Sequence, residues 1–119
     1  MEFNSDFKYD LRVGQVAEEQ LAFLLGSKIE VKSDQKAHIT GNVFIEYESR
    51  GKRSGIATSE AEYYCIVILN RFIILPKDEL KSICRKYIGT NRDVLGGDNN
   101  TSKGILLPIK DLISGYKGD

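Results

Sequence analysis

Two acidic residues, Asp34 and Glu46, have the types and spacing that could support chemistry in this sequence of 119 residues. They are twelve positions apart, and each lies in, or at the end of, a segment that predicts a β-strand. If these strands pair as a hairpin, the carboxylates face each other and repel unless a divalent cation neutralises their charge. This repulsion is the physical argument for a Mg²⁺ or Mn²⁺ site formed by Asp34 and Glu46.

The charged residues of these segments also have a simpler interpretation. Glu30, Lys32, Asp34, Glu46 and Glu48 would form the solvated face of an antiparallel ribbon, with Lys32 paired to a neighbour across the strands. Spacing alone favours this simpler interpretation and leaves the metal site as the alternative.

Three segments would position these residues. Residues 13–25 predict a helix that faces a core, because apolar side chains recur at helical spacing and Gly26 follows as a stop. Residues 27–34 and 42–49 alternate apolar and charged side chains, which predicts two half-buried strands that pair with each other. The apolar stripe of the helix consists of Val13, Val16, Ala17, Leu21 and Leu24.

The middle of the chain predicts a pair of buried strands. Residues 65–70 and 71–76 are rich in β-branched and aromatic side chains and almost free of charge. Residues 58–64, just before them, begin with Thr and Ser followed by Glu, which predicts the start of a short helix.

The C-terminal third predicts a helix, a loop, a strand and a second helix. Residues 77–87 are amphipathic with acids early and bases late, which matches the helix dipole. The polar loop, the strand and the short terminal helix are expected at residues 91–104, 104–109 and 110–116. The whole order predicts a mixed α/β sandwich around one sheet.

Composition narrows the class of protein. With 41% hydrophobic and 29% charged residues the chain is ordinary for a globular protein, and its length predicts one domain, residues 1–119. The 17 basic and 17 acidic residues cancel, so any binding to a polyanion must be local. No apolar run approaches the ~20 residues of a membrane span, and we expect a soluble, cytoplasmic protein with no membrane partner.

Several kinds of site are not expected. His38 is the single histidine, which argues against a His-based zinc hydrolase or a Ser-His-Asp triad. Cys65 and Cys84 have no CxxC spacing and lie in segments that predict burial, so a reducing compartment is expected rather than a disulfide framework or a zinc knuckle. Neither GxGxxG nor GxxxxGK[ST] occurs, so nucleotide cofactor chemistry has no motif.

The order of the acidic features resembles the PD-(D/E)xK nuclease superfamily. A helix with Gly14 and Glu18, a strand ending in Asp34, a glycine turn and the IEYE sequence at residues 45–48 follow its order of helix Glu, strand Asp and (D/E)xK strand. The resemblance covers about residues 13–70 and extends to archaeal Holliday junction resolvases and to small phage-encoded members. It implies a restriction-endonuclease-like sandwich, with a central mixed β-sheet flanked by helices.

The resemblance implies roles for three acidic residues. Asp34 would be the first metal-binding aspartate, Glu46 the acid of the (D/E)xK element, and Glu18 the helix acid. Together they would hold Mg²⁺ or Mn²⁺, which activates water and stabilises charge during hydrolysis of a DNA phosphodiester bond.

Glu48 departs from the superfamily pattern, which usually has lysine at this position. Because an ExE variant occurs in the superfamily, Glu48 would act as a metal ligand or a general base. The missing ammonium would then come from Lys32, which is expected on the same strand face as Asp34, or from Lys36.

Local positive charge could bind a nucleic acid. Arg50, Lys52 and Arg53 follow the second strand at its tip, Ser54 precedes a predicted helix start, and Lys103 lies in the polar loop. Each also has a plain interpretation as part of a charged turn, a helix cap or a solvated connection.

We therefore expect a Mg²⁺-dependent DNA endonuclease that acts on branched or duplex DNA and works as a homodimer. The alternative is a non-catalytic nucleic-acid-binding or assembly module that keeps the nuclease fold without the ExK lysine.

Overall fold

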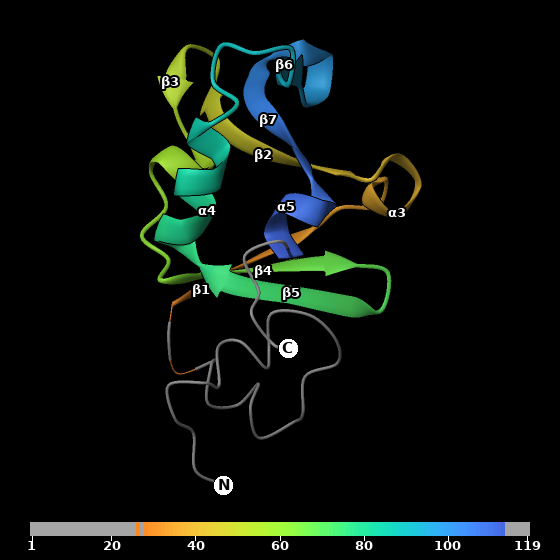
Figure 1. The fold of residues 1–119 in the computed structure, drawn as a ribbon. Helices are drawn as coiled ribbons and strands as arrows, with labels where there is room; N and C mark the ends of the chain where they lie inside the picture. Colours follow the sequence, from red (N-terminus) through yellow and green to blue (C-terminus); the bar gives the residue numbers. More distant parts are fainter. Residues whose placement is uncertain (1–25, 27, 114–119) are drawn as a thin grey trace, which may run out of the picture.

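Residues 26 and 28–113 are described by a computed structural model, apart from the side chain of Asp98. The helix predicted at residues 13–25, with Glu18, lies outside the described residues. The same holds for the last residues of the predicted terminal helix, 114–116. The described part is a compact α/β structure with a mixed sheet, an antiparallel sheet and a few helices (Figure 1).

The mixed sheet has three strands in the order β1-β4-β5. β1 (Ile29–Ser33) runs parallel to β4 (Tyr63–Ile68), and β4 forms an antiparallel hairpin with β5 (Arg71–Pro76). Both strands of the hairpin bury their central residues, which confirms the pair of buried strands predicted from the apolar runs.

The antiparallel sheet has four strands in the order β3-β2-β7-β6. Its two central strands are β2 (Asn42–Ser49) and β7 (Ser102–Pro108), which pair along most of their length. The short edge strands are β3 (Lys52–Arg53) and β6 (Asp93–Gly96). Short edges leave few unpaired backbone groups at the borders of the sheet.

Helices close the space between the two sheets. α4 (Lys77–Arg85) confirms the predicted amphipathic helix and runs along one side of the molecule from the mixed sheet toward the antiparallel sheet (Figure 1). No helix in the described stretch has both the length and the apolar character to cross a membrane. The other helical elements are α3 (Ala37–Thr40), η1 (Gly55–Ala57), η2 (Asp98–Asn100) and α5 (Ile109–Ile113).

One hydrophobic core joins side chains of both sheets. Ile66 and Leu75 contribute from the mixed sheet, and Ile45 and Leu107 from the antiparallel sheet. Burial of this apolar surface is the main favourable term that holds the sheets together. Leu80 of α4 and Leu112 of α5 are fully buried in the same core.

The predicted hairpin between the first two strands and the predicted single sheet are both wrong. β1 pairs with β4, whereas β2 pairs with β7, so the two segments belong to different sheets. Alternation of apolar and charged residues specifies which face of a strand is buried, but it does not specify the neighbouring strand. Asp34 and Glu46 are therefore not brought together by a hairpin register.

Two local predictions are also wrong. The helix expected from residue 58 does not form: η1 ends at Ala57, and Tyr63 and Tyr64 already belong to β4, as suits aromatic residues. The segment 91–104, predicted as a loop, contains β6, η2 and the first residues of β7. β6 pairs with β7 through backbone hydrogen bonds. Because every residue except proline carries these backbone groups, a polar segment can form a strand as well as an apolar one.

Asp34 fixes the turn that carries the chain from one sheet to the other. Its Oδ1 accepts hydrogen bonds from the N–H groups of Lys36 and Ala37, each at 3.0 Å. Its Oδ2 accepts a hydrogen bond from the Phe44 N–H at 3.2 Å. One carboxylate thus ties the end of β1 to the start of α3 and to β2.

Replacing Asp34 with Ala should lower the free energy of unfolding by about 2 kcal/mol, because three backbone donors lose a charged acceptor. Asp34→Asn keeps one acceptor oxygen for Lys36 and Ala37 and should lose about half as much. Urea unfolding of the three proteins measures both changes. An Ala variant as stable as the wild type would contradict this role of Asp34.

Candidate functional site

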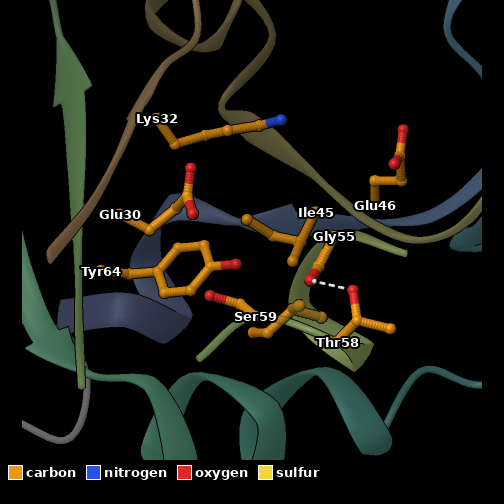
Figure 2. A pocket seen from close by; sticks show the side chains of 9 residues that line it. Glu30, Lys32, Ile45, Glu46, Gly55, Thr58, Ser59 and Tyr64 are labelled. Atoms are coloured by element: carbon orange, nitrogen blue, oxygen red, sulfur yellow. Dashed lines mark hydrogen bonds between the residues drawn. The ribbon is translucent and has the colours of Figure 1, made fainter. Parts of the chain in front are cut away.

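A cleft between the two sheets is the candidate functional site (Figure 2). It encloses about 270 Å³, with β1 and β4 forming one wall, β2 the other, and η1 with the residues after it closing one side. Lys32 and Glu46, both predicted as site residues, line this cleft although their strands do not pair. Its other polar lining residues are Glu30, Thr58, Ser59 and Tyr64.

Two consecutive residues orient Glu46. The hydroxyl of Ser54 donates a hydrogen bond to Glu46 Oε2 at 2.8 Å. Gly55 has φ 53°, and a Cβ on it would lie 2.2 Å from the carbonyl oxygen of Glu46, so only glycine fits this position. Ser54, which the sequence predicts as a nucleic-acid contact, thus donates its hydroxyl to the Glu46 carboxylate in this structure.

The opposite wall carries charges of both signs. Glu30 and Lys32 are two positions apart on β1, so they share a strand face, and they lie opposite Tyr64 and Ile66 of β4. Figure 2 shows the Lys32 side chain extending from β1 into the space between the walls. Burial raises the pKa of Tyr64, contact with Ser59 opposes this, and the charge of Glu30 adds to it. Tyr64 is therefore a hydroxyl donor at neutral pH.

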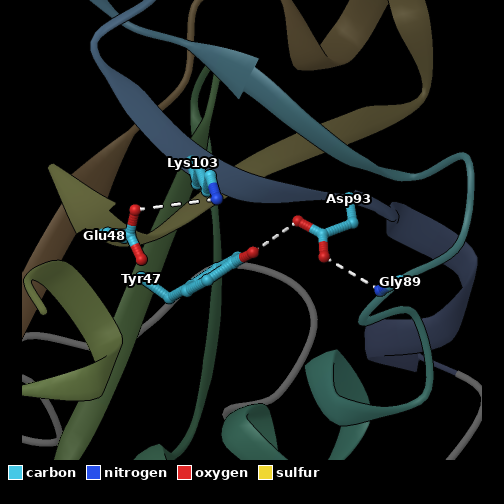
Figure 3. Close-up of polar contacts among 5 residues, drawn as sticks. All are labelled: Tyr47, Glu48, Gly89, Asp93 and Lys103. Carbon is cyan, nitrogen blue, oxygen red and sulfur yellow. Dashed lines mark hydrogen bonds and ion pairs between the residues drawn. The ribbon is translucent and has the colours of Figure 1, made fainter. Parts of the chain in front are cut away.

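Glu48 lies outside the cleft, because a bulge separates it from Glu46. The register between β2 and β7 shifts between these two residues, and Tyr47 is the extra residue. Beyond the bulge, Glu48 forms an ion pair of 3.8 Å with Lys103 (Figure 3). The two acids of the ExE sequence, expected to act together, therefore lie in different surroundings.

Tyr47, next to Glu48, is held in place by Asp93 (Figure 3). Its hydroxyl donates a hydrogen bond to Asp93 Oδ1 at 2.6 Å, and Asp93 Oδ2 accepts one from the Gly89 N–H at 2.9 Å. This hydrogen bond, with burial and nearby negative charge, raises the pKa of Tyr47 to about 12.

The predicted cationic residues lie at one end of the antiparallel sheet. Arg50, Lys52 and Arg53 are exposed at the tip of the β2–β3 hairpin, and Arg53 donates a hydrogen bond to the Ala57 carbonyl at 3.0 Å. Lys103, on the adjacent strand β7, is the partner of Glu48. The tip is therefore a local cationic surface in a chain whose net charge is zero.

The described residues do not form a ready-made metal centre. Among residues 26 and 28–113, no group of three or more His, Cys, Asp or Glu side chains is arranged to hold a metal ion. Asp34 is not in the cleft lining, and its oxygens already accept three backbone hydrogen bonds. Mg²⁺, however, is commonly bound by one or two carboxylates, waters and substrate phosphates. Glu30 and Glu46 are the carboxylates that line the cleft among the described residues, one on each wall.

Comparison of the chain with protein family models, with curated proteins and with solved structures finds no match.

Sequence reasoning missed two polar lining residues of the cleft, Glu30 and Tyr64. Glu30 was grouped with a solvated strand face, although its alternation with Lys32 already predicted a shared face. Tyr64 was assigned to a short helix, and no local signal indicates that it lies opposite Glu30 of β1. Their position depends on the parallel pairing of β1 with β4.

A first prediction concerns the glycine beside Glu46. Gly55→Ala should destabilise the fold by about 3 kcal/mol, because the new Cβ meets the Glu46 carbonyl in a backbone conformation that L-residues rarely adopt. Gly51→Ala is the matched control: it also has positive φ, but nothing lies within 4 Å of its Cβ, so about 1 kcal/mol is expected. Urea unfolding compares them, and equal losses would contradict the close packing.

A second prediction concerns Tyr47. Since its pKa is raised from 10.0 to about 12, its contribution to stability is complete below pH 10 and is lost as pH rises through about 12. The phenolate absorbance of the wild type minus that of Tyr47→Phe should have its midpoint near pH 12. In Asp93→Asn the midpoint should move toward 10.0. A wild-type midpoint at 10.0 would show that Asp93 does not act on Tyr47.

Proposed function

We propose that this chain is a Mg²⁺-dependent phosphodiesterase that cleaves DNA, with its site in the cleft between the two sheets. The observation that supports this most directly is that Lys32 and Glu46 line one cleft with Glu30. Metal-dependent hydrolysis of a phosphodiester requires carboxylates to hold the metal ion and a positive group, such as an ammonium, to stabilise the charge on the phosphate.

The side chains of the cleft have distinct roles in this proposal. Glu46, held by the Ser54 hydroxyl, orients the attacking water and binds the cation on one wall. Lys32 lines the same cleft, where its ammonium would balance negative charge that develops on the phosphate. Glu30 is the second carboxylate. When bound, Mg²⁺ would add Lewis-acid stabilisation of the phosphate oxygens.

The other residues predicted from the resemblance take supporting roles. Asp34 acts as a positioning residue, because its bonds hold the end of the strand that carries Lys32. Glu18 is proposed as a further carboxylate ligand on the basis of the resemblance alone. The restriction-endonuclease-like fold is proposed on the same basis. Glu48 is bound to Lys103 and modulates the charge of the cationic tip.

The cationic tip is proposed to bind the DNA backbone. Arg50, Lys52 and Arg53 are exposed and follow directly from the strand that carries Glu46. Phosphate contacts from such residues position a duplex without reading its sequence. Each contact releases counterions, so affinity should fall with salt concentration.

A non-catalytic nucleic-acid-binding module is the second candidate function. It is favoured by the hydrogen bonds that engage Asp34 and by the separation of Glu48 from Glu46 at the bulge. Such a module would keep the cationic tip and bind DNA without cutting it.

Cleavage assays separate the two candidates. The full chain should cut branched or duplex DNA with Mg²⁺ or Mn²⁺, and Glu46→Gln, which keeps an acceptor for Ser54, should lower the rate by about 10² to 10³. Lys32→Met should have an effect of similar size, with little change in DNA affinity.

Glu60→Gln is the matched control, because Glu60 is exposed and does not line the cleft. It should cut DNA at the wild-type rate. A wild-type chain that binds DNA but cuts none with either metal would favour the binding module. Full activity in both Glu46→Gln and Lys32→Met would remove the cleft from the mechanism.

A further inference from the structure

A second pocket lies on the other side of η1 from the cleft. It has a volume of about 210 Å³ between α4 and the antiparallel sheet, and it shares Ile45 and Ile56 with the cleft. Apolar atoms make up most of its interior, with Tyr47, Cys84 and Ile105 among the lining residues. It is thus a small apolar pocket next to the proposed site of cleavage.

The rim of this pocket carries positive charge. Arg53 of β3 and Lys81 and Arg85 of α4 line it, and none of the Asp and Glu residues that the structure describes does. In a chain with zero net charge, three cations around an apolar interior are complementary to an anion that has an apolar body.

The aromatic ring in the pocket is fixed in place. Tyr47 packs against the core, and its hydroxyl is bound by Asp93 at 2.6 Å. Arg53 is also restrained, because its guanidinium donates a hydrogen bond to the carbonyl of Ala57, another lining residue. A ring and a guanidinium held in place are the groups on which unpaired bases stack.

The size of the pocket limits what it can hold. Its volume of about 210 Å³ is below the ~300 Å³ at which pockets for drug-sized ligands begin. A dinucleotide cofactor is therefore too large, whereas a single base with its phosphate at the rim is of suitable size. A base within a duplex is stacked and paired, so only an unpaired nucleotide can enter.

We infer that this pocket binds one unpaired nucleotide of a DNA strand, with the base against Tyr47 and the apolar residues and the phosphate against Arg53, Lys81 and Arg85. The inference rests on the proposed action on DNA and specifies its substrate: a DNA with a single-stranded segment. The strand would pass over η1, so that the phosphodiester next to the bound nucleotide reaches the cleft with Lys32 and Glu46.

Fluorescence anisotropy with a labelled twelve-nucleotide oligothymidine tests this inference, using the full chain without Mg²⁺ and a blunt duplex of the same length for comparison. Lys81→Gln/Arg85→Gln should weaken binding of the single strand at least tenfold and binding of the duplex much less. Both residues are on the surface of α4, so the variant should fold.

The matched control is Lys86→Gln/Lys110→Gln. It removes the same charge from exposed residues that do not line the pocket, and it should leave single-strand affinity within about twofold of the wild type. Tyr47→Ala should weaken single-strand binding about tenfold, whereas Tyr47→Phe, which keeps the ring, should not. Equal losses in the two double variants, or equal losses on single strand and duplex, would overturn the inference.

Failure of this inference and failure of the proposed function give different results. A chain that binds the single strand through Lys81 and Arg85 but cuts no DNA supports the pocket and contradicts the phosphodiesterase. A chain that cuts DNA without any dependence on these two residues contradicts the pocket alone.

Discussion

The carboxylate of Asp34 connects the two sheets, and the arrangement of the candidate site depends on it. β1 and β2 are consecutive strands that belong to different sheets, so the chain must change direction between them. Asp34 accepts hydrogen bonds from Lys36 and Ala37 at the start of the turn and from Phe44 on the far side. This geometry sets Glu30 and Lys32 across the cleft from Glu46. An aspartate that was expected to bind metal thus supports the site through the backbone.

Two further local constraints shape the wall that carries Glu46. Gly55 allows η1 to approach the Glu46 carbonyl more closely than any residue with a side chain could. The bulge at Tyr47 then separates Glu46 from Glu48 and directs the latter to Lys103. Without the bulge, period-two alternation would keep both carboxylates on one face, where they would repel each other. The bulge therefore separates one carboxylate in the cleft from an ion pair at the tip.

The cleft and the small pocket form two sides of one surface around η1, with different chemistry on each side. The cleft has carboxylates, hydroxyls and one ammonium group, which suit a reaction at a phosphate. The pocket has an apolar interior and a cationic rim, which suit a base and its phosphate. Arg53 contributes to both the pocket and the hairpin tip, so the proposed path of DNA is continuous from the tip to η1.

Local periodicity in the sequence was enough to predict several elements. The strands at residues 29–33 and 42–49, the buried hairpin and α4 all follow from alternation, apolar runs and charge placement. Glu46 was named as a site residue from strand spacing, and Lys32 from the resemblance to a nuclease superfamily. These signals are local because each depends on neighbours within one segment.

Strand partners cannot be predicted in this way. Pairing joins segments far apart in the chain, and many partners satisfy the same alternation. Only the tertiary structure therefore decided that β1 joins β4 rather than β2, that two sheets form, that Glu30 faces the cleft, and that a bulge removes Glu48 from it.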